Sequence, residues 1–333
     1  MGEKVGFIGG FPPPYGGVTI KNKLLYDNLK DQCSIVIFNS RGISNYARLF
    51  FSVLLTNKPY IIGVSASRGK SLLVTKILYF VNKNSMKKSL YFMMGGVESD
   101  RIANSLNEVK MYSFYKKIYV ESEQMRNILL DAGLSNVEYY PNGRVRISRS
   151  LPLNMSNELK CVFFSSICEM KGCMEIIEAA KKCPSVLFYF YGFVNKEFQK
   201  YFYENVESLP NVYYKGVFQG SNLETYVELS EYDVLLLPTK YTTEGVPGII
   251  VEAKICGLSI IASGNSHNKE LIINNEEGLI LKENNTDELF KAIQTYDKDR
   301  SLLQIHKENS KKSAERFYID NYIGNIKKQL NLT

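Results

Sequence analysis

The pattern of hydrophobic and polar residues is clearest between residues 234 and 257. Val234–Leu237 is a continuous apolar run, which is typical of a strand buried on both faces. From Pro238 the chain becomes polar and glycine-rich, and a helical pattern then places Ile249, Ile250, Ala253 and Cys256 on one face. Because Pro247 suits a first helical turn and Gly257 suits the position after the last one, we predict a helix over 247–256.

The amino end of this helix should lie at the carboxyl end of the preceding strand. Open α/β sheets bind ligands at that edge. The first backbone N–H groups of a helix have no partner within the helix, and the helix dipole favours negative charge there. The segment is therefore predicted to form a phosphate-binding site.

Apolar runs alternate with helical patterns along the whole chain, and this alternation indicates parallel sheets covered by helices on both faces, an α/β fold. The predicted strands of the first half lie at 5–8, 35–40, 60–65, 89–94, 117–121 and 137–140, and its helices reach about residue 30 and cover 43–56, 69–82, 99–109 and 122–132. The predicted strands of the second half begin at 161 and lie at 186–191, 212–217, 234–237, 259–263 and 278–282, before a helical stretch at about 303–328.

Length and composition suit two domains of a cytoplasmic protein. The chain has 333 residues, 45% of them hydrophobic, which is enough for two separate cores. Its six cysteines occur singly, without a C-x-x-C pair or zinc-ligand spacing, so we interpret them as reduced core thiols. We find no signal-peptide pattern and no run of about 20 apolar residues, and we expect neither a secreted nor an integral membrane protein.

The net charge of +7 is distributed unevenly. Residues 1–150 hold 21 Lys and Arg against 10 Asp and Glu, whereas residues 151–333 hold 20 against 24. A basic half suits nucleic acid or an anionic membrane. Because no nucleic-acid-binding motif accompanies the charge, we expect no nucleic-acid partner, and peripheral contact with an anionic membrane stays open.

Two glutamates give the segment around the predicted phosphate site its chemistry. Glu244 precedes the helix and Glu252 lies within it, with seven residues between them. This segment resembles the E-x7-E signature of retaining GT-B glycosyltransferases, the glycosyltransferase family 4-like enzymes of bacterial capsule, exopolysaccharide and O-antigen synthesis. The resemblance implies two Rossmann-like domains facing a central cleft and a nucleotide-diphosphate sugar as donor. It also implies that Glu244 contacts the donor sugar and that Glu252 contacts the ribose.

Other interpretations of this glutamate pair carry less weight. The two side chains could instead be a capping glutamate and a solvated glutamate on a helix surface. A glycosidase pair fits poorly, because eight positions at 1.5 Å per helical residue separate the α-carbons by about 12 Å, which is wide for one glycosidic bond.

The resemblance extends to further donor contacts. Lys171, which precedes Gly172, matches the lysine of the family's G-R-x-x-x-x-K-G phosphate clamp, and with Glu244 it is the implied catalytic residue. Aromatic residues at strand ends could equally be core residues. The implied donor-binding residues are Glu252, Gly245, Val246, Pro247, Gly248, Gly16, Gly17, Ser166, Tyr191, Gly192, Val217 and Phe218.

The sequence departs from the family pattern at two donor contacts. Ser166 stands where the clamp has an arginine, so another cation would have to assist, and Arg144, Arg146 and Arg149 are nearby in sequence. Met94 stands where a histidine often contacts the donor sugar. The residues that follow Met94 are weaker candidates for contacts with the acceptor, although the acidic pair among them, Glu98 and Asp100, could simply cap a helix. These acceptor-side candidates are Gly95, Gly96, Glu98 and Asp100.

Domain boundaries follow from the resemblance together with the irregular stretch after the Pro141-Asn142-Gly143 turn. We expect an acceptor-side Rossmann-like domain at 1–150 and a nucleotide-sugar-binding domain at 151–305. Residues 306–333 should form a helix that packs back on the first domain. The apolar stretch 43–56 is interpreted as a helix packed on the core, with an interfacial membrane helix as the alternative.

The expected function is retaining transfer of a sugar, with a UDP-sugar as the co-substrate, to a glycan or lipid-linked glycan acceptor in bacterial surface polysaccharide synthesis. We expect no metal and no other cofactor, since the single D-x-D, at 297–299, lies in a charged connector and only two histidines occur. The protein would work in the cytoplasm, at the inner face of the membrane. The alternatives are a non-catalytic sugar- or nucleotide-binding partner subunit, suggested by Met94 and Ser166, and a GT-B epimerase or phosphorylase.

Overall fold

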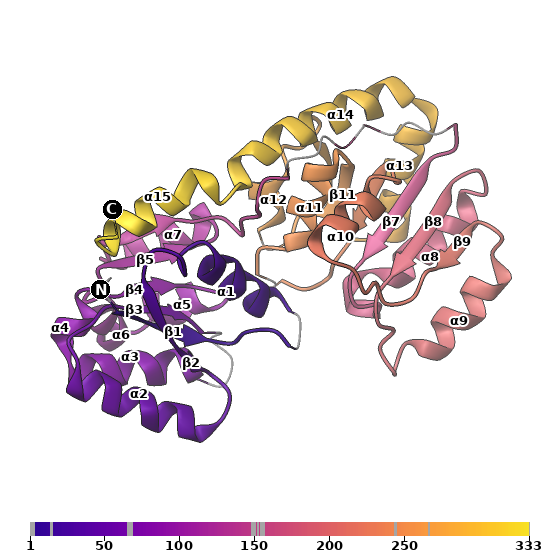
Figure 1. Ribbon diagram of the computed structural model, residues 1–333. Helices are drawn as coiled ribbons and strands as arrows, with labels where there is room; N and C mark the ends of the chain where they lie inside the picture. Colours follow the sequence, from indigo (N-terminus) through magenta and orange to yellow (C-terminus); the bar gives the residue numbers. More distant parts are fainter. Residues whose placement is uncertain are drawn as a thin grey trace. The chain divides into compact units, whose positions relative to one another are not determined.

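The computed structural model divides the chain into two units (Figure 1). The first comprises Met1–Arg146 and Phe317–Thr333, and the second comprises Ile147–Arg316. The first division lies a few residues before the expected one at 150, and residues 306–316 stay with the second unit. The structure describes residues 4–13, 16–64, 69–147, 151, 153, 157–242, 245–265 and 267–332.

The first unit is built on a six-stranded parallel sheet with the order β2-β1-β3-β4-β5-β6. Because β1 pairs with both β2 and β3, the chain changes direction across the sheet between β1 and β3. The strands are β1 (Lys4–Gly9), β2 (Ser34–Asn39), β3 (Tyr60–Gly63), β4 (Leu90–Phe92), β5 (Lys117–Val120) and β6 (Val137–Tyr139).

Helices cover both faces of this sheet. One core cluster lies under α1 and α15, and a second lies under α2, α3, α6 and α7; Figure 1 shows α2 and α3 side by side below the sheet. The helices are α1 (Gly17–Asp27), α2 (Ile43–Leu55), α3 (Lys70–Val81), α4 (Lys83–Met86), α5 (Glu98–Ala103), α6 (Leu106–Tyr112), α7 (Glu123–Asp131) and α15 (Asp320–Gln329).

The second unit contains another six-stranded parallel sheet, with the order β12-β11-β10-β7-β8-β9. Its strands are β7 (Lys160–Phe164), β8 (Leu187–Tyr191), β9 (Val212–Tyr214), β10 (Val234–Leu237), β11 (Ser259–Ser263) and β12 (Gly278–Leu281). Its helices are η2 (Glu169–Lys171), α8 (Cys173–Lys182), α9 (Gln199–Ser208), α10 (Asn222–Leu229), α11 (Gly248–Cys256), α12 (Asn268–Leu271), α13 (Thr286–Lys298) and α14 (Arg300–Ser313), with η3 (Ala314–Phe317) at the passage to the first unit.

The predicted α/β fold with two Rossmann-like sheets is confirmed, but two helix predictions need correction. The stretch 99–109 forms two helices, because Ser105 leaves the helix and its side chain caps α6 by accepting from the Glu108 N–H. The stretch 303–328 is broken after α14, where Phe317 and Ile319 pair with the backbone of Arg144 at 2.9 Å. Within the described ranges, no helix has the length and hydropathy to cross a bilayer.

Candidate functional site

The main candidate site lies in the second unit, at the carboxyl ends of β7 and β10. These strands are neighbours, yet the chain continues from them toward opposite edges of the sheet. Such a switch point leaves a crevice outside the strand ends, where open α/β sheets bind ligands. The segment 165–172 follows β7 and the segment 238–247 leads from β10 to α11, so half of the twelve predicted donor-binding residues lie in these segments or on α11.

The two segments approach each other closely, backbone to backbone. A Cβ on Gly172 would lie 2.0 Å from the Pro238 carbonyl oxygen, and Gly172 has a φ of +78°. The Lys240 N–H donates to the Met170 carbonyl at 2.8 Å, and the Lys240 ammonium pairs with Glu175 at 2.7 Å. Only glycine fits this approach without moving the backbone, which gives the predicted Lys171–Gly172 pair a steric reason.

Lys171 is half-buried at the end of η2, beside the crevice. Its Nζ lies 5.5 Å from the centroid of the Tyr241 ring, so the β7 and β10 segments bring these two side chains together. Tyr241 was not among the predicted site residues. An aromatic residue in a polar loop gives no signal of this kind until the partner loop is placed.

Helix α11 begins at Gly248, with Pro247 as its N-cap, one residue later than predicted, and Gly257 ends it at a φ of +75°. Val246 and Pro247 are buried, whereas Gly245 and Gly248 are half-buried at the crevice. Glu252 is half-buried in the second turn. Glu244 lies outside the described residues. The amino end of this nine-residue helix faces the end of β10, as a phosphate site requires.

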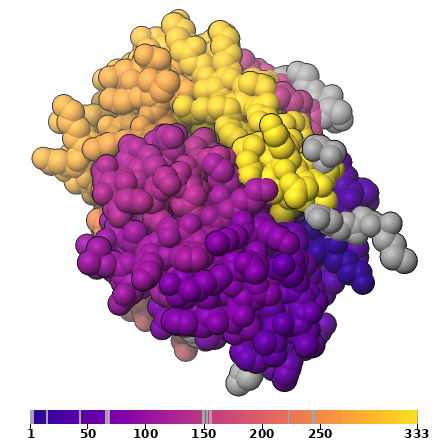
Figure 2. Space-filling model, turned by 90° about the vertical axis from the view of Figure 1, so that its left-hand side faces the viewer, coloured from indigo at the N-terminus to yellow at the C-terminus, as the bar shows by residue number. Residues whose placement is uncertain are grey.

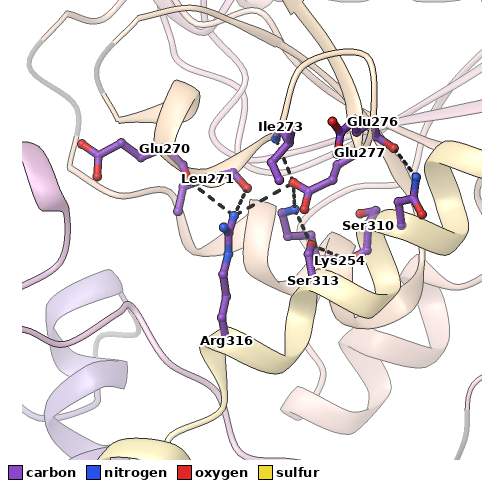
Figure 3. A network of polar contacts seen from close by, with 10 residues as sticks. Lys254, Glu270, Leu271, Ile273, Glu276, Glu277, Ser310, Ser313 and Arg316 are labelled. Atoms are coloured by element: carbon purple, nitrogen blue, oxygen red, sulfur yellow. Dashed lines mark hydrogen bonds and ion pairs between the residues drawn. The ribbon is translucent and has the colours of Figure 1, made fainter.

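A buried polar network fixes α11 (Figure 3). The Lys254 ammonium, fully buried, donates to Glu277 at 2.6 Å and to Ser313 at 2.7 Å. Arg316 joins the network by donating to the Leu271 carbonyl at 2.8 Å. Burial lowers the pKa of Lys254 to about 8, and it outweighs the opposing effect of Glu277. The network therefore ties α11 to α12 and to the end of α14.

Amides and a hydroxyl hold the loop after β10. The Thr239 carbonyl accepts from Ser263 at 2.8 Å, from Asn265 at 3.0 Å and from Asn284 at 2.8 Å. Asn284 also donates to the Pro238 carbonyl at 2.8 Å. Sequence analysis missed these residues, because a single Asn or Ser after a strand is common in any loop.

Backbone hydrogen bonds continue beyond the strand ends and join the loops after β7, β8 and β9. Gly192 has a φ of +141°, and a Cβ there would lie 1.8 Å from the Ser165 carbonyl oxygen. Its N–H donates to the Gly216 carbonyl at 2.9 Å. Beyond the ladder, Ser166 and Val217 are exposed and Phe218 is half-buried.

Tyr191, for which a donor contact through the backbone or ring edge and a core position were both open, has its side chain inside the unit. Tyr191 is buried, its ring stacks on Phe164 at 4.9 Å, and its hydroxyl lies 2.6 Å from that of Tyr232. Tyr191 also donates to Glu228, and burial raises its pKa. The hydroxyl is therefore engaged inside the unit.

The first unit carries the remaining candidates. Gly16 is the N-cap of α1, with an extended φ of −173°, and Gly17 begins the helix. A Cβ on either would meet nothing within 4 Å among the described atoms, so packing of the described chain does not demand glycine at these positions. Gly95 and Gly96 follow β4 and are half-buried, whereas Met94 is buried.

Glu98 is better explained as part of the core than as an acceptor contact. Its side chain is fully buried, and Tyr91 and Arg101 donate to its Oε1 at 2.8 and 3.0 Å. Burial raises the pKa of this carboxyl. Asp100, two residues later and therefore on the opposite side of α5, is exposed. Only Asp100 of this acidic pair is accessible to an acceptor.

Two of the three arginines considered as replacements for the missing clamp arginine, Arg144 and Arg146, belong to the first unit. Arg144 donates to the Gly143 carbonyl at 3.0 Å, and the Arg146 guanidinium lies 4.2 Å from the centroid of the Tyr318 ring. Arg149 lies outside the described residues. In the second unit, Lys240 is a further cation in the segment after β10, and its ammonium pairs with Glu175 at 2.7 Å. Among the described residues, no three His, Cys, Asp or Glu side chains are grouped to hold a metal ion.

Residues 148–313, just under half of the chain, match the family described as "Glycosyl transferases group 1". The matched range covers most of the second unit, including the whole β7–β10 crevice. No curated protein sequence matches the chain.

Solved structures share the whole architecture. Anabaena Alr3699/HepE in complex with UDP has a TM-score of 0.74 at 15% identity, covering 99% of this chain and 100% of that one. The same protein in complex with UDP-glucose has a TM-score of 0.72 at 15% identity, with the same coverage. Sucrose-phosphate synthase from Thermosynechococcus elongatus has a TM-score of 0.72 at 14% identity, covering 99% of both chains. At these identities the likeness shows the fold, which is GT-B with two Rossmann-like domains.

Proposed function

We propose that this protein is a retaining glycosyltransferase that moves a sugar from a UDP-sugar to a lipid-linked glycan in bacterial surface polysaccharide synthesis. One observation carries the proposal. In the part of the chain that matches glycosyl transferases group 1, Lys171 follows β7 and α11 follows the neighbouring β10, the two strands at the switch point of the sheet. The likeness to proteins solved with UDP and UDP-glucose supports the choice of donor.

The crevice suits a leaving diphosphate. Lys171 supplies a compact positive charge after β7, and the first N–H groups of α11 supply oriented donors after β10. When the bond between the sugar and the diphosphate breaks, negative charge grows on the diphosphate. Groups already held at that position stabilise the developing charge without reorganising.

The surrounding contacts keep these groups in position. Backbone contact at Gly172 and the Lys240–Glu175 ion pair lock the β7 and β10 segments together. The buried Lys254–Glu277 pair fixes α11 near its carboxyl end. In the proposed role, Glu252 binds the ribose and Glu244 orients the sugar, so that donor position is set before the acceptor arrives.

The first test measures UDP binding by calorimetry and release of UDP from UDP-glucose and other UDP-sugars. Wild type should bind UDP, and Lys171→Ala should bind at least tenfold more weakly, because a charge-assisted contact to phosphate is lost. Lys182→Ala is the matched control. It removes a lysine of the same unit from the far end of α8, where the ammonium pairs with Asp287 on the surface, and UDP affinity should stay unchanged.

The outcomes separate the competing functions. Two results would support the retaining enzyme. One is slow release of UDP from one UDP-sugar that is lost in Glu244→Gln, and the other is an α-configured product, identified by NMR, from an α-linked donor. UDP binding without turnover on any lipid-linked acceptor would favour the non-catalytic partner subunit. If wild type and Lys171→Ala bind UDP equally, the assignment of the crevice is wrong.

A further inference from the structure

Helix α2 has an apolar face on its solvent side. Leu49 and Val53 pack into the core, as a core helix requires, but four further large apolar residues of α2 point outward. Within 43–55 the only charged residue is Arg48. Two large apolar residues of α3, the helix next to α2, are exposed as well. The six residues, here called the α2–α3 apolar face, are 39% to 78% exposed: Phe50, Phe51, Leu54, Leu55, Leu73 and Phe80.

A pocket rich in lysine lies beside the end of α2, at the amino edge of the first sheet. Its volume is about 460 Å³. Thr56 and Asn57, which follow α2 directly, line it together with residues 329–331 at the end of the chain. Figure 2 views the side of the molecule where this chain end, in yellow, borders the violet surface of the first unit. The five lysines of this pocket, here called the lysine pocket, are Lys4, Lys58, Lys87, Lys88 and Lys116.

Hydrogen bonds join the apolar face to the lysine pocket. The Asn82 side chain, after α3, donates to the carbonyls of Val53 and Thr56 at 3.0 Å each. Lys88 donates to the Asn57 carbonyl at 3.2 Å. The end of α2 and the turn between α3 and α4 therefore form one surface, on which apolar side chains stand next to ammonium groups.

The charge of the lysine pocket is not neutralised within the described chain. None of the described lining residues is acidic, and none of the five lysines forms an ion pair with a described Asp or Glu. Lys116 donates to the Gln329 carbonyl, and Lys58 lies 5.6 Å from the centroid of the Tyr60 ring. Burial and then the charge of Lys4 lower the pKa of Lys58. Binding of an anion would relieve this repulsion.

We propose that the α2–α3 apolar face and the lysine pocket together dock the protein on an anionic membrane, with lipid phosphates at the lysines. A bilayer surface offers both complements at once, since anionic headgroups border apolar chains. A soluble anion would leave the apolar face uncovered. The phosphate backbone of a nucleic acid would likewise not cover six exposed apolar side chains. The proposal rests on the lipid-linked acceptor of the proposed function, and it names the surface through which the protein would reach the membrane.

Flotation with vesicles tests the proposal without requiring sugar transfer. Wild type should bind phosphatidylcholine vesicles that contain phosphatidylglycerol, and bind pure phosphatidylcholine far more weakly. Lys87→Gln/Lys88→Gln should bind the anionic vesicles roughly thirtyfold more weakly, which is the combined contribution of two lysines at such a surface. Phe51→Ser/Leu55→Ser should lose more than tenfold on the same vesicles.

Matched controls lie in the second unit. Lys196→Gln/Lys200→Gln removes the same charge from exposed positions, and Ile305→Ser removes an exposed apolar side chain of α14. Both should bind vesicles as wild type does. Unchanged circular dichroism and urea unfolding in every variant would show that the first unit is folded, and unchanged UDP affinity would separate a failure of docking from a failure of the proposed donor site in the second unit.

Three results would overturn the proposal. The first is equal vesicle binding by wild type and Lys87→Gln/Lys88→Gln. The second is binding of inorganic phosphate at the lysines by a wild-type protein that ignores vesicles, which would make the pocket a soluble-anion site. The third is self-association that disappears in Phe51→Ser/Leu55→Ser while wild type ignores vesicles, which would assign the apolar face to a second copy of the chain.

Discussion

Helices α1 and α11 start at corresponding places in the two sheets, but they are anchored in different ways. Each follows a strand that borders its sheet's switch point, β1 in the first unit and β10 in the second. Asn22, fully buried in α1, donates from its amide to the Gly10 and Gly63 carbonyls at 2.8 Å each. The anchor of α11 is instead the charged Lys254, which lies near the carboxyl end of that helix.

The two anchors also differ in where they lie relative to the amino end of their helix. Asn22 fills the space between β1 and β3, and a Cβ on Gly63 would lie 2.0 Å from its amide oxygen. Asn22 thus occupies the space between these two strands, whereas Gly16 and Gly17 at the amino end of α1 are exposed. In the second unit the anchor, Lys254, lies near the carboxyl end of α11. The amino end of α11 and Lys171 are therefore not used for anchoring, and they follow the carboxyl ends of β10 and β7.

Removing the charged anchor should have the largest effect. Lys254→Met removes the closest cation from the buried Glu277 and leaves the Arg316 guanidinium 4.0 Å away, and we expect a loss of about 3–5 kcal/mol in the free energy of unfolding. Urea denaturation measures this loss. The double variant Lys254→Met/Glu277→Leu should recover much of it, because both charges are then gone. A single variant that costs less than about 1 kcal/mol would contradict the role of this pair.

The same anchor gives a pH signature. The pKa of Lys254 is lowered from 10.5 to about 8 in the folded protein, so the unfolded chain holds more protons between these values. Stability contributed by this residue should therefore rise as the pH increases from about 8 to 10.5, and it should be lowest below 8. Lys254→Met should lack this rise when both proteins are followed over the same range.

Close backbone approach in the second crevice predicts the next effect. Gly172→Ala combines a left-handed φ with a clash against Pro238, and we expect a loss of about 3 kcal/mol. Gly216→Ala is the matched control, since Gly216 has the same φ of +78° and nothing within 4 Å of a Cβ. It should cost about 1 kcal/mol. Thermal or urea unfolding distinguishes them, and equal losses would mean that strain alone, without the clash, explains both.

The predictability of these regions from sequence follows the range of the interactions involved. Hydrophobic periodicity and turn residues are local, so 234–257 could be interpreted as a strand, a loop and a helix, with an error of one residue at Gly248. Contacts between distant polar residues have no such pattern. Lys254 meets Glu277 and Ser313 at separations of 23 and 59 residues, and Asn284 meets Pro238 at 46.

The same reasoning applies to three features whose surroundings the sequence does not show. Glu98 in the sequence is an acidic residue near a glycine pair, and only the packed unit shows Tyr91 and Arg101 on its carboxylate. The break after α14 depends on pairing with Arg144, far away in the chain. The apolar face of α2 was ambiguous for a related reason, because the helix is apolar toward the core and toward solvent alike.

Removing the neutral anchor should have the smallest effect. Asn22→Ala takes away two hydrogen bonds to buried carbonyls, for an expected loss of about 2 kcal/mol. Asn28→Ala is the control at the end of the same helix, where the amide makes one local bond to Leu24 at 2.8 Å, and it should cost less than about 1 kcal/mol. Because an amide does not titrate, the loss in Asn22→Ala should be the same at pH 8 and at pH 10.5. A pH-dependent loss there would show that the two helix anchors do not differ in the way their contacts indicate.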